Sequence, residues 1–313
     1  MKTFGRLISF VILVFLIVSC KKDSNVIKVF HAGSLSVPFK EIVKEFEDKY
    51  PGHTVQLESA GSLSCIRKIT ELKKNCDVLA VADFTLIDEL MIPDYATFNI
   101  LFASNELAIG YLPGSVWEKK VNEFNWPYIL LSDSVRFGRS DPNHDPSGYR
   151  TVILAGLTQK LFGIPEFQEK FLAKNRKYVR PKGTEIIPLL TEREIDFIFH
   201  YSSVLVQHKL AMIRLPDSLN LSTPELNGWY STVCVYVDGN KVGEKIKKCG
   251  ESMIYGICIP ENSLNKKAAE KFVEFVFKRG SEILKNNGQP VLQPELSEGS
   301  IINPEWYKQL KLN

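Results

Sequence analysis

The sequence predicts an α/β protein built as two lobes, each a mostly parallel sheet flanked by helices. Three observations support this fold class. The chain has 313 residues, which is long enough for two compact units of about 100–200 residues each. Strand and helix patterns alternate from Val26 to Ala82 and again through the middle of the chain. The composition, 44% hydrophobic and 24% charged, is typical of a globular protein with a large core.

The first unit begins as a βαβαβ series. Its predicted strands are short apolar runs, over 27–30, 54–57 and 78–82. The last run is unbroken, as in a strand that is buried on both faces. Apolar residues at i, i+3, i+4 and i+7 predict an amphipathic helix over 39–46, and a second helix carries Ile66, Ile69 and Leu72 on one face. This order predicts right-handed crossovers and an open, mostly parallel sheet.

The middle of the chain repeats this alternation. It contains three predicted strands, over 135–138, 178–180 and 196–201. Its predicted helices cover 148–161, 184–192 and 202–208. The last third holds two strand-like runs and one amphipathic helix, over 232–237, 253–259 and 266–277. The segment 106–111 is interpreted as a strand that connects the first and middle units.

The first 20 residues have the pattern of a lipoprotein leader. Lys2 and Arg6 precede an apolar run over 7–18, which is too short for a bilayer span of about 20 apolar residues. A basic start, a short apolar core and a small residue before the cut are typical of an export signal. Ile17-Val18-Ser19-Cys20 resembles a bacterial lipobox, in which Cys20 becomes the lipidated first residue. A plain signal peptide with a chance cysteine is the alternative.

The expected organisation follows from the leader and from the late elements. The late strands and helices have no place in the middle unit, so we expect the chain to return to the first unit. The predicted segments are a signal peptide over 1–19, a tether over 20–25, lobe I over 26–106 plus 232–313, and lobe II over 107–231.

The charge balance argues against a nucleic-acid partner. The formal net charge is +3, and removing the leader takes away Lys2 and Arg6, which leaves 37 basic and 36 acidic residues. A nearly neutral chain without a Lys/Arg block lacks the charge that phosphate neutralisation requires. Five cysteines follow Cys20 and show no CxxC or Cys/His cluster of a zinc site. Their number is odd, so one stays unpaired in a monomer, and a bridge within 234–258 remains open.

One five-residue string occurs twice, as Ala32-Gly33-Ser34-Leu35-Ser36 and as Ala60-Gly61-Ser62-Leu63-Ser64. Both copies follow a predicted strand and begin a helix, where glycine permits a tight turn. Ser34 and Ser62 are expected at N-cap positions, where a hydroxyl accepts from a free backbone N–H. Such helix starts also hold anions, because N–H donors and the positive helix end point at them. The two turns lie at carboxyl ends of strands, where open sheets bind ligands, so capping and anion binding are equal alternatives.

Two further helix starts carry polar groups. Asp145 suits an N-cap and Pro146 suits the first helical position, with Ser147 following. Capping explains this segment alone, whereas the functional interpretation is a third helix start that faces a cleft. Tyr201 lies where a strand leads into a helix, and its hydroxyl is either a ligand donor or part of a half-buried strand tyrosine.

A secreted serine hydrolase is the alternative from a different class. Ser34, His144 and Asp145 have the residue types of a triad, but nothing in the sequence brings them together. The chain has no G-x-S-x-G elbow, P-loop or G-x-G-x-x-G motif. The other histidines show no metal-ligand spacing, and they are His31, His53, His200 and His208. We expect His31 in the core, and we expect a binding protein without a cofactor, not an enzyme.

Segments spread over most of 27–291 match one family pattern in order. They read VFHAGSL at 29–35, AGS at 60–62, IRK at 66–68, DVLAVAD at 77–83, DPN at 141–143, DPSGYR at 145–150, IDF at 195–197, QH at 207–208, IYG at 254–256 and NGQP at 287–290. Together they resemble the molybdate/tungstate-binding proteins of ABC importers, and most closely the archaeal-type branch. The resemblance implies the type II periplasmic-binding-protein fold, in which two α/β lobes close on a tetrahedral oxyanion.

The resemblance also implies a set of ligand contacts at helix starts. These contacts are Gly33, Ser34, Ser62, Asp145, Pro146, Ser147 and Tyr201. Few Lys or Arg residues occur in these loops, which fits a site that replaces the hydration shell with N–H and O–H donors. Asp145 is unusual there, because a carboxylate repels a dianion. Archaeal-type members use carboxylate oxygens as extra ligands to the molybdenum or tungsten centre, so the resemblance makes Asp145 a candidate ligand.

One departure from that branch concerns a ligand glutamate, which archaeal-type members carry in an R-P-K-E-x-E-L string. Here the first glutamate position is Gly183, which has no side chain, and Glu185 lies two residues further on. Residues two apart do not share a helix face. We therefore expect Gly183 to offer a backbone N–H, and Glu185 to be mostly a charge near a helix start and a weaker ligand candidate.

The resulting prediction is an exported, lipid-anchored protein, periplasmic or on the cell surface, that binds molybdate or tungstate. The resemblance implies an ABC permease and ATPase as partners, and we expect a monomer anchored at Cys20 with no nucleic-acid partner. The alternative within the same class is a binding protein for sulfate or phosphate. The serine hydrolase is the remaining alternative.

Overall fold

The computed structural model describes residues 25–239 and 243–311. The predicted signal peptide, Cys20 and all but the last residue of the tether lie outside the described residues. Within the part of the chain that is described, no helix combines the length and the apolar character that a membrane crossing requires.

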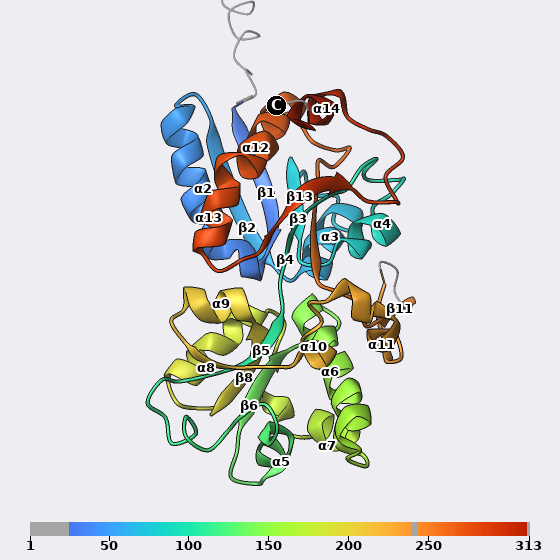
Figure 1. The fold of residues 1–313 in the computed structure, drawn as a ribbon. Helices are drawn as coiled ribbons and strands as arrows, with labels where there is room; N and C mark the ends of the chain where they lie inside the picture. Colours follow the sequence, from blue (N-terminus) through green and yellow to red (C-terminus); the bar gives the residue numbers. More distant parts are fainter. Residues whose placement is uncertain (1–24, 240–242, 312–313) are drawn as a thin grey trace, which may run out of the picture.

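The described residues form two α/β lobes, one above the other in Figure 1, and each is built on its own sheet. Lobe I contains a six-stranded sheet in the order β13-β4-β12-β3-β1-β2. Its strands are β1 (Val26–Ala32), β2 (Thr54–Ala60), β3 (Val78–Val81), β4 (Ile100–Ser104), β12 (Ile254–Cys258) and β13 (Val291–Leu296). Lobe I therefore combines early strands with strands from the end of the chain, as the sequence pattern predicts.

Lobe II contains a five-stranded sheet in the order β7-β6-β8-β5-β9. Its strands are β5 (Leu107–Tyr111), β6 (Phe137–Ser140), β7 (Val179–Arg180), β8 (Phe197–Tyr201) and β9 (Ala211–Arg214). A separate hairpin pairs β10 (Cys234–Asp238) with β11 (Lys245–Cys249). Because this hairpin belongs to neither sheet, the lobe boundaries at 106/107 and 231/232 remain our proposal.

The expectation of mostly parallel sheets is wrong, because both sheets are mixed. In lobe I, β1 runs parallel to β2 and β3, but β12 is antiparallel to β3 and β4, and β13 is antiparallel to β4. In lobe II, β6 is parallel to β7 and β8, whereas β5 is antiparallel to β8 and β9. The antiparallel pairs involve strands where the chain leaves or re-enters a lobe. Only Asn105 and Glu106 separate β4 from β5, so no crossover helix sets their direction.

The helices surround the two sheets (Figure 1). Those of lobe I are η1 (Gly33–Leu35), α2 (Ser36–Lys49), α3 (Ser62–Thr70), α4 (Thr85–Leu90), α12 (Lys266–Phe277), α13 (Arg279–Asn286) and α14 (Glu305–Lys311). The others are α5 (Trp126–Leu131), α6 (Pro146–Phe162), α7 (Phe167–Ala173), η2 (Arg176–Tyr178), η3 (Gly183–Ile186), α8 (Ile187–Thr191), α9 (Ser202–Gln207), α10 (Asp217–Asn220), η4 (Pro224–Leu226) and α11 (Asn227–Tyr230).

Most predicted helices are present, and their apolar faces are buried. Phe39 and Phe46 of α2 pack edge-on against Phe272 of α12. The predicted helix face that ends at Leu72 needs a correction, because α3 ends at Thr70 and Leu72 is 64% exposed. Lys73 has a positive φ, so the chain turns away immediately after the helix.

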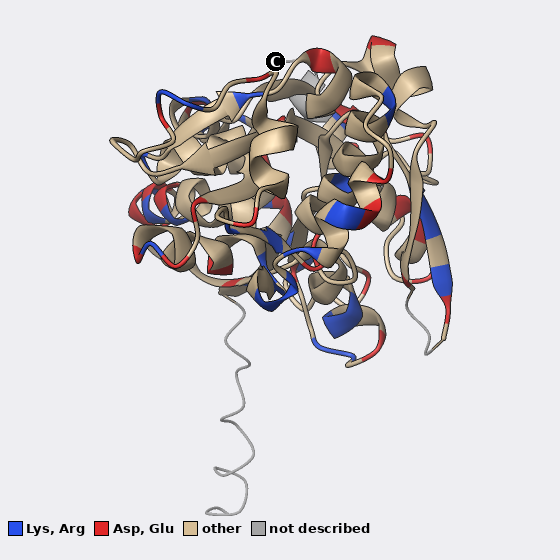
Figure 2. Cartoon of the chain, turned by 90° about the horizontal axis from the view of Figure 1, so that it is seen from below, with Lys and Arg blue, Asp and Glu red and all other residues tan. Residues whose placement is uncertain are grey.

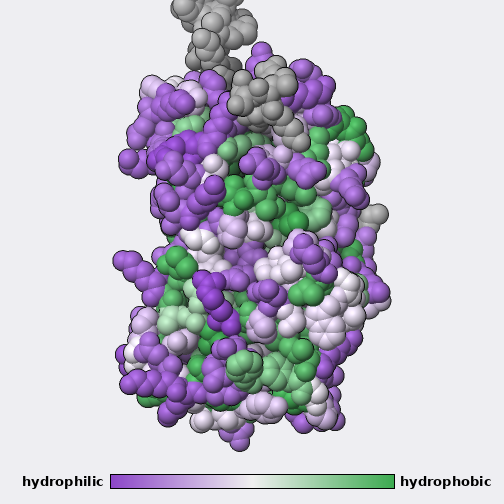
Figure 3. Space-filling model, viewed as in Figure 1, coloured by the Kyte–Doolittle hydropathy of each residue, from purple (hydrophilic) through white to green (hydrophobic). Residues whose placement is uncertain are grey.

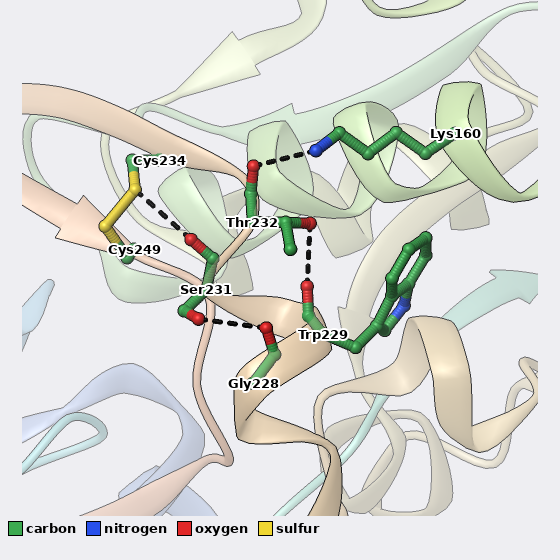
Figure 4. Close-up of a disulfide and its surroundings, with 7 residues drawn as sticks. All are labelled: Lys160, Gly228, Trp229, Ser231, Thr232, Cys234 and Cys249. Atoms are coloured by element: carbon green, nitrogen blue, oxygen red, sulfur yellow. Dashed lines mark hydrogen bonds between the residues drawn. A yellow bond between two sulfur atoms is a disulfide. The ribbon is translucent and has the colours of Figure 1, made fainter.

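A disulfide between Cys234 and Cys249 closes the β10–β11 hairpin (Figure 4). The two cysteines face each other in the antiparallel register. The hairpin base is tied to α6, since Lys160 donates to the Thr232 carbonyl at 2.9 Å. The other three described cysteines are buried thiols, at Cys65, Cys76 and Cys258.

Acidic and basic residues both occur along the ribbon drawn in Figure 2, including the β10–β11 hairpin. The space-filling view shows a narrowing between the two lobes along one side (Figure 3). The candidate site lies where the loops of the two lobes meet at this level.

Candidate functional site

The predicted site residues come together at the interface between the lobes. Gly33 and Ser34 follow β1, and Ser62 follows β2, so these three belong to lobe I. Lobe II contributes the loop and helix start after β6, the turn after β7 and the last residue of β8. The residues at these places are Asp145, Pro146, Ser147, Gly183 and Tyr201, and all are buried. Strand ends from both sheets thus converge on one place.

The lobes approach closely at two glycines. A methyl group at Gly61 would lie 2.0 Å from the His144 carbonyl oxygen, and one at Gly33 would lie 3.2 Å from Lys182 Cε. Backbone contact at Gly61 excludes any larger residue, which explains why glycine is needed in this copy of the repeated string. The Arg67 guanidinium donates across the same interface to the Asn143 carbonyl at 3.0 Å. The lobes are therefore in direct contact around the site.

The expectation that Ser34 and Ser62 cap helices through their hydroxyls is wrong. Gly61 is the N-cap of α3, and the cap positions of η1 and α2 have no side-chain hydrogen bond either. Ser62 Oγ instead accepts from the Ala82 N–H at 3.0 Å, and Ser34 Oγ accepts from the Tyr255 hydroxyl at 2.8 Å. Both serines are held by parts of lobe I that are distant in sequence.

In both of these bonds the serine hydroxyl is the acceptor, so its own proton remains available. A backbone N–H has one proton, so the bond from Ala82 leaves the Ser62 proton free for another acceptor. The Tyr255 hydroxyl accepts a hydrogen bond from Asn105 Nδ2 at 3.1 Å and donates its own hydrogen bond to Ser34 Oγ. The Ser34 proton is therefore also left for an acceptor outside this chain of bonds.

Tyr201 has the same arrangement in lobe II. Its hydroxyl accepts from Arg150 Nη1 at 2.8 Å, which leaves the phenol proton outside that bond. The same Arg150 nitrogen donates to the Ala82 carbonyl in lobe I at 2.7 Å. A chain of hydrogen bonds through Ala82 and Arg150 thus joins Ser62 to Tyr201. The ring centroids of Tyr201 and Tyr255 lie 6.3 Å apart.

Asp145 is the N-cap of α6, as predicted, with Pro146 in the first turn. Its Oδ1 accepts from the Ser147 N–H at 2.9 Å, and its Oδ2 accepts from the Gly183 N–H at 3.0 Å. Burial raises the pKa of Asp145, and these two backbone bonds act in the opposite direction. The Gly183 N–H, which we expected to be offered to a ligand, is donated to this carboxylate instead. Ser147 Oγ shares a hydrogen bond with Ser140 Oγ.

The weaker candidate Glu185 lies in η3 and is exposed. Its position in the first turn of a short helix matches the predicted role as a charge near a helix start.

The triad of the hydrolase alternative is not assembled. Asp145 is bonded to two backbone N–H groups, and Ser34 is bonded to Tyr255. The ring of His144 faces Asp141, with Nδ1 3.5 Å from the carboxylate, and is partly exposed. None of these contacts joins the serine to the histidine.

Sequence reasoning missed the charged cluster that supports Tyr201. Arg150 is 2% exposed, and its Nη2 lies 3.8 Å from Asp83 Oδ2. The same carboxylate oxygen accepts from the Tyr149 hydroxyl and lies 3.7 Å from Lys248 Nζ. Burial would raise the pKa of Asp83, but Lys248 and Arg150 lower it to about 2. Burial would likewise lower the pKa of Arg150, but Tyr201 and Asp83 hold it above its usual range. The GYR string was visible in the sequence, but its burial was not.

Comparisons with known proteins agree with this architecture. Residues 27–289 match the family model described as bacterial extracellular solute-binding protein. An uncharacterized solute-binding protein of Petrotoga mobilis is 44% identical, with 86% of this chain and 84% of the relative covered. The molybdate/tungstate-binding protein WtpA of Pyrococcus abyssi is 34% identical, with 98% of each chain covered.

Solved structures share the fold at low sequence identity. The periplasmic molybdate-binding protein of Azotobacter vinelandii superposes with a TM-score of 0.61 at 16% identity, over 85% of this chain and 100% of that one. The sulfate-binding protein SubI of Mycobacterium tuberculosis gives 0.60 at 13% identity, over 91% and 90%. The two-lobed periplasmic-binding-protein fold predicted from the sequence is confirmed, and the chain belongs to the bacterial extracellular solute-binding protein family.

Proposed function

We propose that this chain captures molybdate or tungstate outside the cytoplasm and delivers it to an ABC importer. One observation carries the proposal: hydroxyls from both lobes gather at the interface, and no described residue accepts a hydrogen bond from them. Ser34, Ser62 and Tyr201 each accept a hydrogen bond from a protein donor and can each donate to a ligand oxygen. The name of the WtpA relative supports the choice of oxyanion.

The arrangement suits a tetrahedral dianion. A buried anion must exchange its hydration shell for protein donors, and hydrogen bonds to charged groups contribute roughly 1.5–3 kcal/mol each. Arg150 lies behind the Tyr201 hydroxyl and strengthens it as a donor without needing to touch the ligand. Gly33, Asp145, Pro146, Ser147 and Gly183 form the remaining wall in the proposal.

Coordination beyond four oxygens is not favoured by this donor set. Both oxygens of Asp145 already accept backbone N–H bonds, and position 183 has no side chain. Asp145 could approach the molybdenum or tungsten centre only through its remaining lone pairs. We propose that Asp145 is at most a single extra ligand.

Calorimetric titration of the mature, detergent-solubilised protein tests the proposal. We expect tight binding of tungstate or molybdate and at least roughly 100-fold weaker binding of sulfate and phosphate, about 2.7 kcal/mol. Preference for sulfate or phosphate would support the alternative within the same class. Turnover of generic esters, lost in Ser34→Ala, would support the hydrolase and overturn the proposal.

We also propose that lipid at Cys20 holds the protein at the membrane, as a monomer beside its permease and ATPase. One saturated chain gives only marginal membrane binding, so two or more chains are expected. Cys20→Ala should move the protein from the membrane fraction to the soluble fraction. Unchanged membrane association of the variant would contradict the anchor.

A further inference from the structure

His200 is the last residue before Tyr201 in β8, and it is 2% exposed. Its Nδ1 accepts the backbone N–H of Tyr201 at 2.8 Å. A ring nitrogen that accepts has no proton, so this bond assigns the single proton of the neutral ring to Nε2. Burial lowers the pKa of His200 to about 3, so the ring is neutral near pH 7. His200 therefore presents one N–H donor, at Nε2.

This donor has no hydrogen-bond partner among the described residues, although it is buried. A buried donor without a partner loses its hydrogen bonds to water and gains none in return, so native proteins rarely keep one without a reason. His31, near the end of β1, differs in this respect, because its Nδ1 lies 2.9 Å from the Ala32 carbonyl oxygen.

The position of Nε2 connects it to the candidate site. A methyl group at Gly183 would lie 2.7 Å from His200 Nε2 and 3.1 Å from Ser147 Oγ. Any side chain at 183 would therefore collide with the imidazole. The Gly183 N–H itself donates to Asp145 Oδ2. The imidazole N–H thus lies beside Gly183 and Ser147, both members of the proposed site.

We propose that His200 donates its Nε2–H to an oxygen of the bound oxyanion. This inference rests on the proposed function and adds a donor to the site that the family resemblance did not include. A neutral ring whose Nδ1 already accepts a hydrogen bond can only donate through Nε2, so it needs an accepting oxygen of the kind that a tetrahedral oxyanion presents. It also places a donor beside position 183, where a carboxylate would compete for the same space.

Three variants separate the donor from the volume of the ring. His200→Gln keeps an N–H near the position of Nε2, and we expect its tungstate affinity to stay within about threefold of wild type. His200→Asn can still accept the Tyr201 N–H but has no group at the Nε2 position, and we expect a loss of about tenfold or more. His200→Phe keeps the volume without either nitrogen, and we expect a similar loss. His53→Asn, in lobe I, is the matched control and should bind as wild type does.

Calorimetry with tungstate and molybdate gives the affinities, and thermal melting checks that each variant folds. The ¹⁵N signal of His200 Nε2 gives a second readout, assigned by its absence in His200→Gln. Addition of tungstate should shift this signal and slow exchange of its proton. An unmoved signal, or equal affinities in all three variants, would show that Nε2 meets only water and would overturn the inference while the proposed function stands. Wild-type protein that binds neither oxyanion would overturn both.

Discussion

The two lobes support their site hydroxyls in different ways. In lobe I, Ser34 and Ser62 are held by neutral donors of the same lobe, the Tyr255 hydroxyl and the Ala82 N–H. In lobe II, Tyr201 is held by the Arg150 guanidinium, which also bonds to lobe I.

This difference separates what each half needs in order to be complete. The lobe I half depends only on contacts within its own lobe, so it can persist when the lobes move apart. The lobe II half includes the bonds of Arg150 to Ala82 and its approach to Asp83, which exist only when the lobes are in contact. We infer that lobe closure and ligand binding share Arg150.

Replacing Arg150 should have a larger effect than any other single substitution around the site. Arg150→Met removes the support of Tyr201 and leaves Asp83 buried with only Lys248 as a nearby cation among the described residues. Removing one partner of a buried ion pair costs about 3–5 kcal/mol. We expect that loss in the free energy of unfolding, measured in urea, and a loss of tungstate affinity of about 100-fold or more by calorimetry.

Arg279→Met is the matched control for Arg150, because Arg279 forms its ion pairs with Glu45 and Glu282 at the surface. Exposed ion pairs contribute little to stability, so the unfolding free energy of Arg279→Met should stay close to that of wild type. If Arg150→Met keeps wild-type affinity, the two halves of the site are independent and the comparison between them fails.

Ser34→Ala tests the lobe I half by itself. The variant loses a donor to a charged ligand, which corresponds to about 10- to 100-fold in affinity. It should also lose roughly 1–3 kcal/mol of unfolding free energy, because the Tyr255 hydroxyl loses its acceptor. Calorimetry and urea unfolding measure the two effects, with Ser281→Ala, at a partly exposed serine of α13, as control. Lower stability with unchanged affinity would make Ser34 a purely structural residue.

The sequence predicted where the site residues lie along the chain, but it did not predict the residues that hold their side chains in position. Helix starts after β1, β2 and β6 were found because a glycine–serine string or an Asp-Pro pair is a local signal. The bond between Ser34 and Tyr255 joins residues 221 positions apart, and no local pattern reports such a contact. The same holds for Arg150, whose burial depends on how the two lobes meet.

The fold shows the same limit. A short apolar run located β1, and helical periodicity located α2, in which Phe39, Ile42 and Phe46 are buried on one face. Neither signal predicted β13 or the antiparallel direction of β12, which depend on where the returning chain enters the lobe I sheet. The hydrogen-bond partners of Ser34 and Ser62 could not be predicted either, since a serine at a helix start is compatible with capping or with the observed bonds.

His31 gives a pH test that concerns lobe I alone. Burial lowers its pKa from 6.5 to about 4. Between these values the unfolded chain binds a proton that the folded protein does not, so the unfolding free energy falls as the pH falls. The contribution is roughly 2 kcal/mol between about pH 7 and about pH 5. Urea unfolding of His31→Asn at the same two pH values should show a smaller decrease than wild type by about that amount. Parallel decreases in the two proteins would contradict this role of His31.

The smallest effect is expected at Glu185, which sharpens the comparison at the edge of lobe II. Glu185 is exposed in η3, two residues after Gly183, and residues two apart do not share a helix face. Glu185→Gln removes only a charge near the start of a short helix, so tungstate affinity should stay within about threefold, under about 1 kcal/mol. Calorimetry beside Glu192→Gln, another exposed glutamate of this segment, measures the difference. A large loss confined to Glu185→Gln would mean that its carboxylate reaches the ligand after all, and that lobe II supplies a charged ligand in place of the neutral donors inferred around Gly183.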